Sequence, residues 1–232
     1  MTSSDPRDHL VLVLDVERLD DALAYAERMA PWFSIVKVGY ELYGSAGPEA
    51  FEALRHKGFR VFADLKLHDI PTTVERGARS IGRHGVDFLN FHAAGGEAML
   101  RAGVDGLVDG ARGVGHDRPL ALAVTVLTSD SDVDALSDRM GIAVRSGCDG
   151  VVCAGTDIPH ARERSLRTMV PGIRLPHGAV HDQARVDTPG DAIARGADWL
   201  VIGRAVSDAH DPEQAAQDIT RDVAAALDGD VT

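Results

Sequence analysis

The feature that most constrains the fold is an alternation of short apolar runs with amphipathic segments, repeated eight times along the 232 residues. The apolar runs predict strands over 10–16, 35–39, 61–67, 88–92, 120–127, 151–154, 169–171 and 200–203. The segments between them predict helices over 19–29, 48–57, 74–84, 97–108, 135–146, 158–166, 189–195 and 212–227. Strands that alternate with helices pair in parallel, so the pattern predicts an α/β fold.

The number and spacing of these units favour one (β/α)8 TIM barrel that takes up residues 1–232 as a single domain. The unit recurs roughly every 27 residues, and a barrel of this class needs about 250 residues in all. The continuous apolar run 10–14 suits a parallel sheet that is buried on both faces. A doubly wound sheet is the alternative, but its first turn would be glycine-rich, whereas Asp15-Val-Glu-Arg18 follows the first strand.

Charge and composition exclude several other classes of protein. The net charge of −12, from 36 acidic and 24 basic residues, argues against general nucleic-acid binding. The chain has no apolar stretch long enough for a membrane span, and its polar beginning lacks the apolar core of a signal peptide. Cys148 and Cys153 are too few and too close together for a disulfide scaffold. We therefore expect a cytoplasmic protein without a membrane partner.

Charged residues stand near the carboxyl ends of three successive predicted strands. In a barrel, the chemistry lies at the carboxyl ends of the strands, where this chain has Asp15, then Lys37, then Asp64 with Lys66. Only three of the 24 basic residues are lysines, and two of those three occupy these strand ends. A lysine ammonium can release a proton, whereas an arginine in a protein cannot. The pattern therefore indicates a site for proton chemistry.

The segment 62–73 concentrates these charges. Asp64 and Lys66 are two residues apart, so on a strand they point to the same face, and opposite charges hold each other in the ionised form. A purely structural interpretation is an ion pair at a strand end, with Asp69 as the N-cap of the next helix and Pro71 in its first turn. The charges that follow the two preceding strands favour a catalytic site instead.

Two later segments indicate a phosphate site. Gly203-Arg204 follows the last strand, and the loops after strands 7 and 8 of such barrels commonly bind phosphate. A bidentate arginine beside backbone N–H groups suits a dianion. The segment 172–187 is long for a loop between a strand and a helix, and such loops are often lids. Gln183 and Arg185 are its candidates for closing over the phosphate.

His92, after the fourth strand, is interpreted as a structural residue. No second histidine stands at ligand spacing on a neighbouring strand end, which argues against a bound metal. The sequence therefore predicts no metal site.

The run 62–73, Phe-Ala-Asp-Leu-Lys-Leu-His-Asp-Ile-Pro-Thr-Thr, resembles the Asp-x-Lys-x-x-Asp-Ile-Pro-x-Thr signature of the bacterial and archaeal orotidine 5'-phosphate decarboxylases. Further family segments follow in order: Val-Leu-Asp15-Val, Val-Lys37-Val-Gly, Phe-His92-Ala-Ala-Gly-Gly, Thr125-Val-Leu-Thr128-Ser, Val170-Pro171-Gly-Ile-Arg, Asp182-Gln183-Ala-Arg185-Val and Ile202-Gly203-Arg204. The resemblance implies conversion of orotidine 5'-phosphate to uridine 5'-phosphate and CO₂, the last step of UMP synthesis, without metal or cofactor.

The same resemblance implies a role for each matching residue. Lys66 stabilises and protonates a C6 carbanion, and Asp64 lies where the substrate carboxylate departs. Lys37 and Asp69 keep the charges in place. The implied substrate-binding set is Asp15, Lys37, Ile70, Thr73, Thr128, Pro171, Gln183, Arg185, Gly203 and Arg204. The resemblance also implies a homodimer in which Asp69, Ile70 and Thr73 complete the active site of the partner subunit.

Two rival interpretations stay open. The related decarboxylase of 3-keto-gulonate 6-phosphate shares the Asp-x-Lys-x-x-Asp pattern but uses Mg²⁺ and an enediolate, and the Ile70-Pro71 pair and Gln183 point away from it. The second rival is a nucleotide-binding barrel without catalytic activity. Such a protein would lack some of the lysines and aspartates of the signature, whereas this sequence has all of them. Decarboxylase activity that survives treatment with EDTA would exclude the Mg²⁺-dependent rival.

Overall fold

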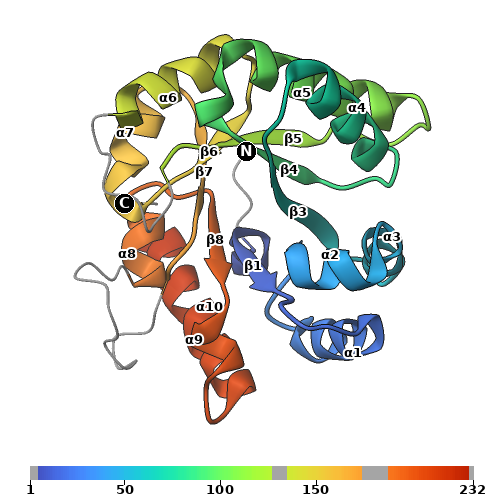
Figure 1. Ribbon diagram of the computed structural model, residues 1–232. Helices are drawn as coiled ribbons and strands as arrows, with labels where there is room; N and C mark the ends of the chain where they lie inside the picture. Colours follow the sequence, from blue (N-terminus) through green and yellow to red (C-terminus); the bar gives the residue numbers. More distant parts are fainter. Residues whose placement is uncertain (1–4, 127–134, 174–187, 230–232) are drawn as a thin grey trace.

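The computed structural model describes residues 5–126, 135–173 and 188–229, and in it eight parallel strands close into a barrel (Figure 1). The strands pair in sequence order, and β8 closes the ring against β1. The strands are β1 Leu10–Val13, β2 Ile35–Val38, β3 Arg60–Leu67, β4 Phe88–His92, β5 Leu120–Val124, β6 Gly150–Val152, β7 Arg167–Val170 and β8 Trp199–Ile202. The predicted (β/α)8 barrel is confirmed.

Helices surround the barrel. The α-helices are α1 Leu19–Met29, α2 Tyr40–Ala46, α3 Glu49–His56, α4 Pro71–Gly82, α5 Gly96–Arg112, α6 Ala135–Arg145, α7 Ile158–Arg162, α8 Pro189–Ala194, α9 Arg204–Ser207 and α10 Pro212–Gly229. Short 3-10 helices are η1 Pro6–His9, η2 Ala93–Gly95 and η3 Gly155–Asp157. All eight predicted helices are present, whereas α2, α9 and the 3-10 helices were not predicted. In the described part of the chain no helix has the length and apolar character needed to cross a membrane.

The barrel interior changes from apolar to polar along the strands. A cluster with one side chain from most strands fills the interior: Val11, Ile35, Phe62, Phe88, Leu122, Met169 and Trp199. Phe88 lies edge-on to Trp199, with ring centroids 4.9 Å apart. Because side chains alternate along a strand, the residue two positions farther on returns to the same side. Two positions beyond Ile35, Phe62 and Phe88 stand Lys37, Asp64 and Asn90, so a polar layer lies above the apolar one.

Three aspartates make the same kind of hydrogen bond at the amino-terminal ends of the strands. Asp87, Asp149 and Asp198 come directly before β4, β6 and β8. Each carboxylate accepts a backbone N–H at 2.8–2.9 Å from the preceding strand, from Val61, Ala121 and Thr168 respectively. These bonds satisfy strand N–H groups at the end of the barrel opposite the predicted site, and they leave the carboxyl ends of the strands open for chemistry.

Glycines bring α4 and α5 into close contact, and the two helices lie side by side in Figure 1. A Cβ atom on Gly106 would lie 2.2 Å from the carbonyl oxygen of Glu75, and one on Gly110 would lie 2.1 Å from that of Arg79. From the opposite side, a Cβ on Gly82 would lie 2.4 Å from the carbonyl oxygen of Leu107. This backbone-to-backbone packing holds the helix that begins directly after Asp69 and Ile70.

Candidate active site

Four charged side chains form a continuous chain of ion pairs at the carboxyl ends of β1, β2 and β3. Lys66 Nζ lies 2.5 Å from Asp64 Oδ1, and Lys37 Nζ lies 3.4 Å from Asp64 Oδ2. Lys37 Nζ also lies 3.2 Å from Asp15 Oδ1. The strand register explains this meeting, since Lys37 pairs with Val13 on one side and with Phe62 on the other. The structure thus brings together the four charges that the strand-end pattern predicted.

The chain of charges runs from the interior towards solvent. The side chains of Lys37 and Asp64 are 10% and 14% exposed, whereas that of Asp15 is 59% exposed. Burial raises the pKa of Asp64, but the charges of Lys37 and Lys66 and the hydrogen bonds from Lys66 and Asn90 together hold this pKa below its ordinary value. Asp64 is therefore ionised at neutral pH. Its negative charge faces two ammonium groups in a partly dehydrated setting, where electrostatic interactions are strong.

The backbone at Lys66 adopts a conformation that residues with a side chain rarely take. Its φ angle is +44°, in the left-handed region, which costs roughly 1–3 kcal/mol for a residue other than glycine. The pairing of β3 with β4 shifts at this point: β3 advances from Ala63 to Leu67 while β4 advances only from Leu89 to Phe91. The extra residues form a bulge that contains Asp64 and Lys66, and bulges commonly re-aim side chains next to active sites.

A cavity of about 250 Å³ opens beside these charges. Its walls come from β1, β2, β7, β8 and the segments that follow them, and they are formed by Val13, Asp15, Lys37, Pro171, Gly172, Ile173, Val201, Gly203, Arg204 and Ala205. Five residues of the predicted site, Asp15, Lys37, Pro171, Gly203 and Arg204, therefore line one hollow. The exposed Arg204 begins α9 and lines the same cavity as the buried Lys37.

Asp69, Ile70 and Thr73 lie at the start of α4, and none of them lines this cavity. All three are exposed, and none of the ion pairs found within the described ranges involves Asp69. In the purely structural interpretation Asp69 was the N-cap, but Ile70 is the N-cap, while Pro71 is in the first turn as that interpretation expected. A proline disfavours the helical conformation in the residue before it, which leaves Asp69 one position outside the helix. Its carboxylate accepts the N–H of Ile70 at 2.6 Å.

Three predicted substrate-binding residues, Thr128, Gln183 and Arg185, lie outside the described residues. The candidate lid 172–187 is described only at Gly172 and Ile173, which both line the cavity. The roles predicted for Thr128, Gln183 and Arg185 therefore stay predictions.

Three further residues at the site were missed in the sequence. Gly39 leaves room for the charges, because a Cβ there would lie 2.9 Å from Lys37 Nζ and 3.2 Å from Asp15 Oδ1. The Tyr40 hydroxyl donates to the carbonyl of Leu65 at 2.9 Å, and its ring centroid lies 6.0 Å from Lys66 Nζ. Asn90 is fully buried and contacts the bulge of β3. The sequence did offer one indication of a role for Asn90, since it is the single polar residue inside the apolar run 88–91.

His92 stands at the end of β4, with its ring centroid 5.5 Å from that of His68. Burial lowers the pKa of His92, and the nearby charges of His68, Arg139 and Lys66 lower it further. The buried Nδ1 of His92 has no hydrogen-bond partner within the described residues. The ring is therefore neutral at pH 7, and its interpretation as a structural residue stays a prediction.

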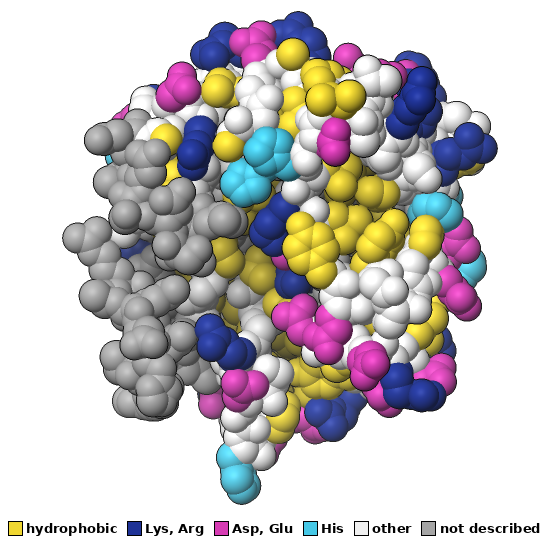
Figure 2. Space-filling model, viewed as in Figure 1, with side chains coloured by type: hydrophobic (Ala, Val, Ile, Leu, Met, Phe, Trp, Pro, Cys, Tyr) yellow, Lys and Arg dark blue, Asp and Glu magenta, His cyan; other side chains and the backbone are white. Residues whose placement is uncertain are grey.

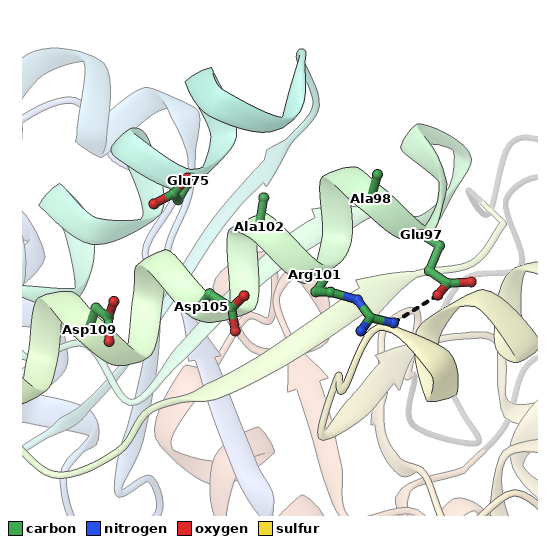
Figure 3. Close-up of a pocket in the computed structure, with 7 residues that line it drawn as sticks. All are labelled: Glu75, Glu97, Ala98, Arg101, Ala102, Asp105 and Asp109. Carbon is green, nitrogen blue, oxygen red and sulfur yellow. Dashed lines mark hydrogen bonds and ion pairs between the residues drawn. The ribbon is translucent and has the colours of Figure 1, made fainter.

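A larger groove, of about 760 Å³, lies on α4 and α5 and not at the strand ends. Figure 3 shows its lining: Glu75 from α4, and Glu97, Ala98, Arg101, Ala102, Asp105 and Asp109 along α5. Arg101 is tied to Glu97 by an ion pair of 2.8 Å. The groove has acidic walls and holds neither lysine nor histidine. We therefore place the chemistry in the smaller cavity.

Other kinds of chemistry have little support in the described residues. Nowhere in the ranges given above do three or more His, Cys, Asp or Glu side chains gather in a way that could hold a metal ion. Burial raises the pKa of the Cys148 thiol to about 12 and that of Cys153 further still, so neither thiol is ionised at neutral pH.

Figure 2 shows basic, acidic, histidine and hydrophobic side chains close together near the middle of one face.

A closed parallel barrel with alternating lysines and aspartates at its carboxyl-terminal mouth defines the class of this protein: a (β/α)8-barrel enzyme with a charged, lysine-bearing site. Residues 8–219 match the family described as Orotidine 5'-phosphate decarboxylase / HUMPS family. The chain belongs to this family, so the resemblance seen in the sequence is confirmed.

Individual relatives agree with that assignment over almost the whole chain. A protein of Nitratidesulfovibrio vulgaris named orotidine 5'-phosphate decarboxylase is 43% identical, over 93% of this chain and 97% of its own length. One of the same name from Alkalilimnicola ehrlichii is 42% identical, over 93% and 96%. The crystal structure of orotidine 5'-phosphate decarboxylase from Lactobacillus acidophilus superposes with a TM-score of 0.77 at 31% identity, covering 92% of this chain and 98% of that one.

Proposed function

We propose that this chain decarboxylates orotidine 5'-phosphate to uridine 5'-phosphate and CO₂, as the last step of UMP synthesis, without a metal ion or an organic cofactor. The observation that carries the proposal is the chain of ion pairs Asp15–Lys37–Asp64–Lys66 beside a cavity that Arg204 also lines. The relatives' shared name gives the substrate, and the charges give a means of acting on it.

Lys66 is the proposed catalytic residue. When the bond between C6 and the carboxylate breaks, its electron pair stays on C6, where the pyrimidine delocalises it poorly. A fixed ammonium beside C6 lowers the energy of that carbanion, and preorganised charge in a site with little water is a large catalytic effect. The same ammonium then donates a proton to C6, which yields uridine 5'-phosphate, and the neutral amine takes up a proton from solvent. Lysine can do this and arginine cannot.

The neighbouring charges keep Lys66 in its working state. Asp64 contacts Lys66 and Lys37 at 2.5 and 3.4 Å, so it favours the ammonium form of both. In the bound complex Asp64 lies near the departing carboxylate. Asp15 and Lys37, which line the cavity, hold the ribose hydroxyls.

In this proposal the phosphate lies beside Gly203 and Arg204, which line the same cavity. Arg204 and the N–H of Gly203 bind it there, and Pro171 also lines the cavity. From the resemblance, Thr128 and Gln183 contact the base, and Gln183 and Arg185 approach the phosphate. Energy from binding the non-reacting phosphate is then available to position the reacting carbon.

The proposed active unit is a homodimer in which Asp69, Ile70 and Thr73 complete the site of the partner subunit. The exposure of the start of α4 supports this arrangement. Ile70 is 66% exposed and Tyr40 is 65% exposed, and both lie where chain segments leave the mouth of the barrel. Side chains exposed at the mouth are accessible to a second subunit. The cytoplasmic location expected from the sequence suits this function and stays a prediction.

The direct test follows the absorbance of orotidine 5'-phosphate after the purified protein is added. We expect the substrate absorbance to decline, with uridine 5'-phosphate formed in equal amount, and the rate to be unchanged by excess EDTA. A parallel reaction offers 3-keto-gulonate 6-phosphate with Mg²⁺. Turnover of that substrate alone, abolished by EDTA, would assign the chain to the magnesium-dependent reaction. No turnover of either substrate would support a silent nucleotide-binding barrel.

A further inference from the structure

Asn90 is a fully buried polar residue with apolar neighbours on both sides in β4. It lies in β4 between Leu89 and Phe91, and all three are 0% exposed. It stands two positions beyond Phe88 of the interior cluster, at the level of Lys37 and Asp64. A buried amide is costly unless its hydrogen-bonding groups are satisfied. Its partners therefore indicate what the residue does.

Both ends of the Asn90 amide bind the bulge of β3. Its Nδ2 donates to Asp64 Oδ1 at 2.6 Å, and its Oδ1 accepts the backbone N–H of Lys66 at 2.7 Å. A carboxylate only accepts hydrogen bonds and a backbone N–H only donates them. A bridge between the two needs one donor and one acceptor on a short, planar group, which is what an asparagine side chain provides.

The bridge fixes the two features on which the geometry of Lys66 depends. The first is the left-handed backbone at Lys66, whose N–H is turned towards Asn90 instead of a strand partner. The second is the orientation of the Asp64 carboxylate. Asp64 Oδ1 is shared between Asn90 and Lys66 Nζ, so that Oδ2 faces Lys37. One side chain thus sets the positions of the acid and the lysine relative to each other.

We infer that Asn90 is a positioning residue, which aims the Lys66 ammonium by holding the Lys66 backbone and the Asp64 carboxylate on either side of one amide. This inference rests on the proposed function. Asn90 acts through Asp64 and Lys66, and it need not touch the substrate. A displacement of about 1 Å in a catalytic group can reduce a rate by about 100-fold.

The test compares Asn90→Leu, which keeps the volume and removes both hydrogen bonds, with Asn90→Ser, which is smaller and polar. Thr168→Val is the matched control, because Thr168 is also a fully buried polar residue on a barrel strand but bonds only at the other end of the barrel, to Asp198. We expect kcat for orotidine 5'-phosphate to fall by about 100-fold in both Asn90 variants, while the Kd of uridine 5'-phosphate changes by less than about threefold. The control should keep kcat within about threefold.

A crystal structure of each folded variant gives a readout that does not depend on activity. We expect the Lys66 backbone to leave its positive φ and the contact between Lys66 Nζ and Asp64 Oδ1 to be lost or lengthened. If that geometry is unchanged, or if kcat is retained, Asn90 does not position Lys66. Equal losses of kcat and of nucleotide binding, or failure of both variants to fold, would assign Asn90 to the fold alone. A wild-type protein without turnover would overturn the proposed function, and the crystal structures would still decide the role of Asn90.

Discussion

Lys66 is the residue on which the proposed chemistry depends most directly. Lys66→Ala removes both the charge beside C6 and the proton donor, so we predict a loss of about 1,000-fold or more in kcat, a size typical of removing a preorganised charged group. The measurement is a steady-state assay of orotidine 5'-phosphate turnover. A circular dichroism spectrum and the Kd of uridine 5'-phosphate check that the fold and the rest of the site are intact.

Lys66→Arg is the matched comparison, because it keeps the positive charge and removes the capacity to donate a proton. We expect it to be impaired as well. A Lys66→Ala protein that keeps more than about a tenth of wild-type kcat would have lost only ~1.4 kcal/mol of transition-state stabilisation, and that result contradicts the assigned role.

Arg204 contributes to affinity through a group that does not react. Arg204→Ala should weaken the binding of substrates and products that carry a phosphate, and barely affect orotidine and uridine, which lack one. The measurement is kcat/KM for orotidine 5'-phosphate beside that for orotidine, with the Kd of uridine 5'-phosphate as a check. Equal losses with and without the phosphate would place the phosphate elsewhere in the site.

Asp64 links the site to stability at acid pH. Its pKa in the folded protein lies below the ordinary value of 3.8, because the two lysine ammonium groups outweigh the effect of burial. A carboxyl group of this kind contributes stability that is complete above its unfolded pKa and is lost as the pH falls through the folded one. We predict that the free energy of unfolding of the wild type, relative to Asp64→Asn, is constant from about pH 8 to about pH 5 and then declines.

Urea unfolding at a series of pH values measures this difference. The comparison with Asp64→Asn removes the contributions of the other carboxyl groups, which titrate in both proteins. A difference that increases towards low pH would mean that the pKa of Asp64 is raised in the folded protein, and the proposed pairing with Lys37 and Lys66 would then be wrong.

The charges at the strand ends were predictable from the sequence, whereas the residue that holds them was not. Asp15, Lys37 and Asp64 stand near the carboxyl ends of predicted strands, so their places at the mouth follow from strand parity and chain order. Asn90 depends on the bulge in β3, and the sequence pattern showed β3 as a regular strand. Tertiary contacts create that bulge, so alternation of residue types could not reveal it.

At the scale of secondary-structure elements, the contact between α4 and α5 depends on glycine. Gly106→Ala places a Cβ atom 2.2 Å from the backbone oxygen of Glu75, so one of the two helices must move. We predict a loss of about 1–3 kcal/mol in the free energy of unfolding, the usual cost of overpacking. Thermal or urea unfolding measures it.

Gly44→Ala is the matched control, since Gly44 is also helical, in α2, but has nothing within 4 Å of the added Cβ. Alanine is the better helix former by up to about 1 kcal/mol, so this variant should be unchanged or more stable. If Gly106→Ala were equally harmless, the two helices would not be held by close backbone contact.

Helix prediction was most accurate at α1 and missed α2 and α9, although the comparably short α7 and α8 were predicted. α1 spans Leu19–Met29, which are the predicted bounds. α9, Arg204–Ser207, is too short to show a period, and α2 contains Gly44, which weakens a helical pattern. The helix predicted over 74–84 starts three residues too late, because α4 begins at Pro71, whose fixed φ suits a first helical turn.

At the scale of the whole molecule, closure of the barrel brings together residues from both ends of the chain. β8 pairs with β1, which places Gly203 and Arg204 in the same cavity as Asp15. Chain order alone predicted this meeting once eight units were counted, because a ring of eight parallel strands has no other neighbour for its last strand. We propose on this basis that residues 1–232 form one domain. The contribution of a partner subunit, by contrast, followed only from the family resemblance.

The last prediction tests the shared site, and it depends on Asp69 serving the neighbouring subunit. Lys66→Ala and Asp69→Ala are each expected to be inactive alone. If each site takes Lys66 from one subunit and Asp69 from the other, a mixed dimer has one site with both defects and one site with neither. Random exchange makes about half of the dimers mixed, so activity should recover to about one quarter of the wild-type value.

Subunit exchange itself must be measured in the same samples, for example by native mass spectrometry of subunits with tags of different mass. A mixture of Lys66→Ala with Lys66→Arg is the control, since every site in it lacks Lys66 and no recovery is expected beyond the activity of Lys66→Arg alone. If exchange is complete and the first mixture stays inactive, Asp69 acts within its own chain. The exposed start of α4 would then need a different explanation, and Ile70 and Thr73 would lose their proposed place in the partner's site.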